Sequence, residues 1–201
     1  MMGEQKKALT AGVALLERSI EYAVGSLRLV TPDALCRGTP CSGWSLQRLL
    51  DHLGDSLGSL NEAAASRTVE LCPVSAAPWP VLTNPALSLR DEATMVLGAW
   101  TALLAGEPVS IGGWHVSSPV VAAVGAIEVA VHGWDVARSC GEQRPIPPAL
   151  AEELLDLAQV FVTPADRPGR FAARVGVPCT TPAQDRLLAF LGRDPNWRVH
   201  L

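Results

Sequence analysis

The feature that most constrains this chain is an apolar segment, residues 119–139, with two polar side chains in its middle. Valine, isoleucine and alanine surround Glu128 and His132 and leave little of the segment for solvent. Ser118 is placed to cap a helix there, and Gly141 lies just beyond its end. A helix that is apolar on all sides is usually buried. We therefore expect a helical domain whose core contains this segment.

Glu128 and His132 need an explanation in such a helix. A buried carboxylate without a partner is costly, by several kcal/mol even after relaxation. Residues four apart share one helical face, so the two side chains can converge on one point. A divalent cation there would neutralise the carboxylate and use the imidazole lone pair. A plain Glu–His hydrogen bond, or an arginine from another helix paired with Glu128, would also satisfy the carboxylate.

Apolar periodicity predicts further helices around this one. They are expected at residues 4–30, 46–66, 89–105 and 148–162, with a short last helix capped by a Thr181-x-x-Gln184 box. Ser45 and Ser88 are the expected caps of the second and third helices. A Gly-rich loop at 106–118 and a mixed segment at 163–179, with room for a short extended stretch, separate the others. The predicted fold class is all-α, a four-helix bundle with a helical C-terminal extension.

His52 strengthens the metal interpretation. It lies about two turns into the predicted helix 46–66, beside the apolar stripe that contains Leu49 and Leu53. A single histidine there is usually a packed core residue. Together with Glu128 and His132, however, it gives three potential ligand residues on two helices, in a chain with only four histidines. Two histidines and one carboxylate leave coordination positions open, as catalytic metal sites do.

Composition excludes several classes of function. The net charge is −4 and there is no basic run, so nucleic-acid binding is not expected. Five scattered cysteines form no CxxC pair, which favours a reducing compartment, and we expect the cytoplasm. No stretch reaches the roughly 18 uninterrupted apolar residues typical of a membrane span. The N-terminal stretch is interpreted as an amphipathic helix and not as a signal peptide. A homodimer is left open.

The sequence also resembles a known family. "TPCSGWSLQRLLDHL", followed some seventy residues later by "EVAVHGWDVARSCG", is similar to the DinB/YfiT-like metal-binding superfamily. The nearest branch includes the N-terminal domain of mycothiol-dependent maleylpyruvate isomerase. The ending "PAQDRLLAFLGRDP" resembles the tail of short, single-domain actinobacterial members. The resemblance implies one DinB-like domain over residues 1–201, with the bundle at about 4–140 and the extension at about 141–201.

The resemblance further implies a metal triad and a class of chemistry. The family's histidine on the second helix and Glu-x3-His on the fourth match His52, Glu128 and His132. Characterised members hold zinc or another divalent ion and use a low-molecular-weight thiol, such as mycothiol, for S-transfer or isomerisation of a small electrophile. The chain is expected to lack the separate C-terminal domain of the full isomerase. No catalytic residue is assigned beyond the metal ligands.

Several other residues are candidates near the site. Trp44, Trp134 and His115 are predicted to contact substrate or thiol, although core packing for the tryptophans and a solvated loop for His115 are the simpler alternatives. Cys41 precedes the second helix, whose positive end would favour a thiolate, but it is not assigned as a ligand.

Two nearby charge pairs have simpler explanations. Asp135 and Arg138 are interpreted as a surface salt bridge. Arg193 and Asp194 are interpreted as an ordinary pair at a helix end.

Three functions remain open from the residues. The first is a metal-dependent thiol transferase or isomerase. The second is a metal- or ligand-binding accessory protein without turnover. The third is an iron(II) oxygenase, which uses the same two-histidine, one-carboxylate set.

Overall fold

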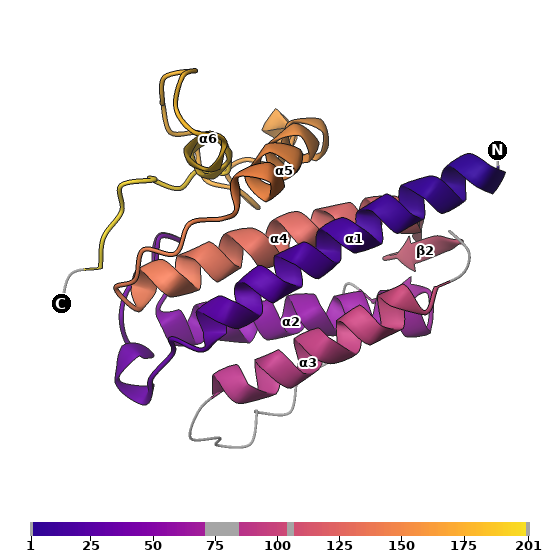
Figure 1. The fold of residues 1–201 in the computed structure, drawn as a ribbon, viewed down its shortest axis with the longest axis horizontal. Helices are drawn as coiled ribbons and strands as arrows, with labels where there is room; N and C mark the ends of the chain where they lie inside the picture. The colour runs from indigo at the N-terminus through magenta and orange to yellow at the C-terminus, as the bar shows by residue number, and fades with distance from the viewer. Residues whose placement is uncertain (1, 71–84, 104–106, 200–201) are drawn as a thin grey trace.

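The computed structural model describes residues 2–70, 85–103 and 107–199. Four long helices form the main body: α1 (Met2–Leu27), α2 (Leu46–Ala65), α3 (Pro85–Thr101) and α4 (Ser118–Ser139). Two shorter helices follow in the C-terminal part, α5 (Pro148–Phe161) and α6 (Ala183–Phe190). A short 3₁₀ turn follows α1, η1 (Pro32–Ala34), and another follows α5, η2 (Pro164–Asp166). The predicted all-α bundle with a helical extension is confirmed. Figure 1 shows α5 and α6 together at one side of the bundle, next to α1 and α4.

The four long helices α1, α2, α3 and α4 run up, down, down and up, in that order. Gly12 of α1 lies against Pro119 at the start of α4, and Ala23 lies against Gly133 farther along, so α1 and α4 are parallel. The indole of Trp100 in α3 donates a hydrogen bond of 3.0 Å to the Leu60 carbonyl oxygen in α2, near the end of both helices. This arrangement puts α4 in contact with α1, α2 and α5.

Burial explains why α4 is apolar on nearly all sides. Of its 22 residues, the large majority are buried, including Glu128's neighbours Ile127 and Val129. By length and composition α4 could cross a membrane, but 83% of its apolar window is buried inside the protein. Among the described residues it is the one helix that passes this test. Its hydropathy is that of a core helix, which contacts other helices in place of solvent.

The prediction for the Gly-rich loop was wrong. Residues 108–117 form a hairpin of β2 (Pro108–Ile111) and β3 (Trp114–Ser117), and β1 (Thr68–Val69) pairs in parallel with β2. Gly112 and Gly113 both have positive φ, 54° and 86°, the backbone of a two-residue turn that glycine readily adopts. The hairpin leads directly into α4.

Three predicted caps were also wrong. Ser118 is the first residue of α4, and Ser117 occupies the cap position. Ser88 lies inside α3, which begins earlier at Pro85, a residue whose fixed φ suits a first helical turn. The predicted box at Thr181 does not form, because Pro182 is the cap of α6 and the Gln184 side chain instead accepts a 2.7 Å hydrogen bond from the Ile146 amide. Described residues 167–179 contain no strand.

Candidate metal centre

The three predicted ligands come together between α2 and α4. Ser45 caps α2 as predicted, its side chain accepting a hydrogen bond of 3.3 Å from the Arg48 amide. The cap fixes the start of the helix, and the buried leucine stripe of α2 turns His52 toward α4. His52 Nε2 lies 2.7 Å from Glu128 Oε1, and His132 Nε2 lies 3.0 Å from the same oxygen. One ligand atom from each residue lies within 4.8 Å of the other two.

This convergence requires either donated protons or a cation at its centre. Two imidazole nitrogens point at one carboxylate oxygen, and neither contact is a hydrogen bond unless the nitrogen carries a proton. Either the two rings donate protons to Glu128, or a cation lies between the three lone pairs. Ligands about 2.0–2.1 Å from a tetrahedral ion are about 3.3 Å apart. The Nε2–Oε1 distances are a few tenths of an ångström shorter, so the residues fit a metal with small side-chain movements.

The pKa values reflect the same competition for protons. Burial alone would favour the neutral imidazole of His132, but the charge of Glu128 and the hydrogen bond to Asp135 raise its pKa to about 9. Burial would likewise raise the pKa of Glu128, yet the two histidines hold that pKa well below its ordinary value. A metal ion bound here would therefore have to displace protons, as metal binding to histidine generally does.

Trp44 forms one wall of the site, and its predicted contact with substrate or thiol stays a prediction. Its ring meets His52 edge-on at 5.0 Å between centroids and stacks nearly parallel to His132 at 6.4 Å. The Trp44 amide donates to the Cys41 carbonyl oxygen, which fixes the indole at the start of α2. The exposed Arg48 guanidinium lies 4.7 Å from the Trp44 ring centroid on the outer side. The wall thus combines an aromatic face with a cation.

The interpretation of Asp135 as a surface residue was wrong. Its side chain is fully buried, and its Oδ2 accepts a hydrogen bond of 3.0 Å from His132 Nδ1. Arg193, predicted to pair at a helix end, is 8% exposed and donates to the same oxygen at 3.2 Å. Arg138 instead donates to the Trp197 carbonyl oxygen. Metal-ligating histidines commonly have such a carboxylate on their second nitrogen, because it fixes the tautomer.

The structure does not bring Trp134 or His115 to the triad. Two residues along an α-helix turn by about 200°, so Trp134 faces away from His132 and is buried, with Arg138 over its ring. His115 is exposed on β3, and Glu128 lies ten residues into α4, about 15 Å along the axis. Neither residue has a place beside the three ligands.

Cys41 is a neutral thiol beside the site. It is partly buried, and burial raises its pKa, although the Arg193 guanidinium opposes this. The expected thiolate at the helix start is therefore wrong. Among the described residues, the one group of metal-ligand side chains contains no cysteine, which agrees with leaving Cys41 out of the ligand set.

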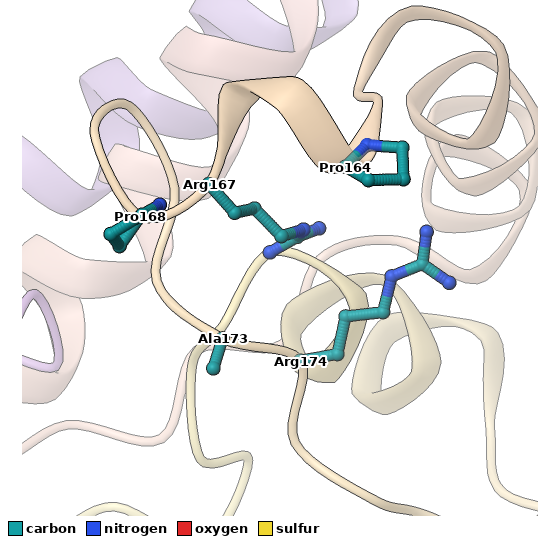
Figure 2. Close-up of a pocket in the computed structure, with 5 residues that line it drawn as sticks. All are labelled: Pro164, Arg167, Pro168, Ala173 and Arg174. Atoms are coloured by element: carbon teal, nitrogen blue, oxygen red, sulfur yellow. The ribbon is translucent and has the colours of Figure 1, made fainter.

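A separate pocket lies in the C-terminal extension. Figure 2 shows Arg167 and Arg174 among the residues that line it, with Pro164, Pro168 and Ala173. Its volume is about 460 Å³, and none of the three candidate ligands lines it. It therefore carries no part of the argument about the metal centre.

Comparison with known proteins identifies the family of the chain. Two Mycobacterium tuberculosis proteins, printed as "Uncharacterized protein MT0763" (strain CDC 1551 / Oshkosh) and "Uncharacterized protein Rv0738" (strain H37Rv), are each 29% identical over 183 residues. Each alignment covers 88% of this chain and 94% of the relative. No solved structure gives a significant match. The model of the mycothiol maleylpyruvate isomerase N-terminal domain matches residues 16–137, which include His52, Glu128 and His132. The chain belongs to this family.

Proposed function

We propose that His52, Glu128 and His132 hold one divalent metal ion of the zinc class. The supporting observation is the convergence of Nε2, Oε1 and Nε2 from two helices, all within 4.8 Å. Imidazole and carboxylate suit zinc and similar first-row ions, whereas magnesium and calcium prefer oxygen ligands alone. Three protein ligands on a four-coordinate ion leave one position for water or substrate.

The burial of the three ligands gives the site one open side. The His132 side chain is 4% exposed and closes the interior side, whereas those of Glu128 and His52 are 30% and 37% exposed. A small molecule can thus approach past His52 and Glu128, along the Trp44 ring. The aromatic face would contact its apolar part, and Arg48 over that ring favours a molecule with negative charge.

The proposed ligand for the open position is the sulfur of a small thiol, mycothiol. A bound ion would favour the thiolate over the thiol, whose ordinary pKa is about 8.5. Membership of the mycothiol maleylpyruvate isomerase N-terminal domain family supports this class of thiol. The residues of the chain would bind the thiol, and the Trp44 ring would orient it. Buried His132 would exclude water from the interior side of the site. The proposed activity is S-transfer to, or isomerisation of, a small electrophile in the cytoplasm.

Thiol titration into the cobalt-substituted protein tests this function. We expect mycothiol to produce a sulfur-to-cobalt charge-transfer band. With an electrophile, the thiol should either be consumed by S-transfer or be regenerated as the electrophile is isomerised. His52→Ala is the matched control, since it removes one ligand from the exposed side. If mycothiol leaves the cobalt spectrum unchanged and no adduct forms with any electrophile tested, a non-catalytic metal-binding role should replace the enzyme. Iron with oxygen-dependent turnover would instead support the oxygenase.

A further inference from the structure

Arg193 reaches the metal centre from outside the matched family segment. It follows α6 in the C-terminal extension, whereas the family match ends at residue 137. Its guanidinium is buried and held in two directions: Nη1 donates a 3.0 Å hydrogen bond to the Leu191 carbonyl oxygen, and Nη2 donates to Asp135 Oδ2. The Arg193 amide also donates to the Leu188 carbonyl oxygen at 2.8 Å. The side chain therefore has a fixed position at the end of α6.

The Asp135 carboxylate connects this arginine to His132. Its Oδ2 accepts from both Arg193 Nη2 and His132 Nδ1, while Oδ1 has no hydrogen-bond partner among the described residues. One donor leaves a carboxylate free to rotate, whereas two donors from different directions fix its plane. The fixed oxygen in turn sets the direction of the His132 ring, and so the direction of its Nε2 lone pair.

Arg193 also neutralises the buried charge of Asp135. Asp135 is fully buried, and a buried carboxylate is costly without a positive partner and hydrogen bonds. The other group on this oxygen, His132, is neutral whenever it ligates a metal. The Arg193 guanidinium stays positive whether or not His132 ligates a metal. Arg193 is thus the permanent counter-charge in this part of the site.

We propose that Arg193 is a positioning residue of the metal centre: through Asp135 it fixes the His132 ring so that Nε2 faces Glu128 and His52. The C-terminal extension is then part of the site and not an appendage to it. This inference rests on the metal binding proposed above. It adds that a contact outside the ligand set determines how well the metal is held.

The test compares two variants that break the same contact with one that does not. Arg193→Leu removes the donor, and Asp135→Asn keeps the size of the acceptor while removing its charge. Arg138→Leu is the matched control, because Arg138 also ties the C-terminal tail to α4, through the Trp197 carbonyl oxygen, without contacting Asp135. Zinc affinity is measured by competition with a chromophoric chelator, and ring orientation by the visible spectrum of the cobalt-substituted protein.

We expect Arg193→Leu and Asp135→Asn to weaken zinc binding by about 10–100-fold, the usual effect of losing such an outer contact, and to alter the cobalt spectrum. Arg138→Leu should keep wild-type affinity and spectrum. If Arg193→Leu does not fold, Asp135→Asn decides alone. Wild-type affinity and spectrum in both contact variants, or equal weakening in Arg138→Leu, would overturn the inference while leaving the metal site intact. Absence of zinc binding to the wild-type protein would instead overturn the proposed function and this inference together.

Discussion

Replacing Gly133 by alanine should destabilise the bundle although alanine favours helices. A Cβ atom at this position would lie 2.9 Å from Ala23 Cα and 3.0 Å from Ala23 Cβ, in the α1–α4 contact. The nearest atom belongs to the backbone of α1, which cannot move as a flexible side chain can. Overpacking of this kind costs about 1–3 kcal/mol. The better helix propensity of alanine returns about 1 kcal/mol. At the upper end of the overpacking cost, the net loss of folding stability is about 2 kcal/mol.

Gly98→Ala is the matched control for this prediction. Gly98 is also helical, but it is exposed and a Cβ there would meet nothing within 4 Å. The substitution should stabilise the protein by up to about 1 kcal/mol.

Thermal unfolding followed by circular dichroism measures both changes. For a chain of this size each kcal/mol shifts Tm by about 2–4 °C, so Gly133→Ala should melt up to about 8 °C below wild type. A Gly133→Ala protein that melts above wild type, as Gly98→Ala should, would refute the close α1–α4 spacing.

Three further predictions concern the metal centre. Zinc at 100 times its Kd should stabilise the native state by about 2.7 kcal/mol and so raise Tm; calorimetry that shows the same Tm with zinc and with chelator would contradict native-state binding. Glu128→Gln should keep the shape but weaken zinc binding in calorimetric titration, since a charged ligand is lost; unchanged affinity would remove Glu128 from the ligand set. Without metal, the raised His132 pKa of about 9 stabilises the folded state at pH below the unfolded value of about 6.5, and this stability is lost as pH rises through 9. The metal-free protein should therefore lose Tm between pH 7 and 10 more steeply than His132→Gln, and parallel profiles would argue against this proton.

The sequence predicted the triad because its signal is local. Glu128 and His132 are four residues apart on a helix that is otherwise apolar, so their shared face follows from helix geometry alone. His52 required a second helix, but the leucine stripe around it fixed which face it occupies. Trp44 was predicted near the triad because it lies in the same sequence motif as His52. Identification of the family from the same motifs agrees with the match over residues 16–137.

The contact between Asp135 and Arg193 could not be found in this way. The two residues are 58 apart, and Arg193 lies beyond a short helix where no periodicity indicates which way a side chain points. Spacing alone suggested Arg138 as the partner, three residues from Asp135. By contrast, the hairpin had a local signal, a Gly112–Gly113 pair between Val109 and Val116, which was interpreted as a loop. Long-range pairing depends on tertiary packing, which a single sequence does not display.

Metal content tests the central claim most directly. Protein purified gently, without chelator, should contain one divalent ion per chain by elemental analysis, and the metal-free protein should regain one zinc on titration. His52→Ala should bind zinc much more weakly, because it removes one of three ligands without disturbing the Glu128–His132 turn of α4. Wild-type protein without stoichiometric metal, binding added zinc no more tightly than His52→Ala, would contradict the assignment of His52, Glu128 and His132 as a metal centre.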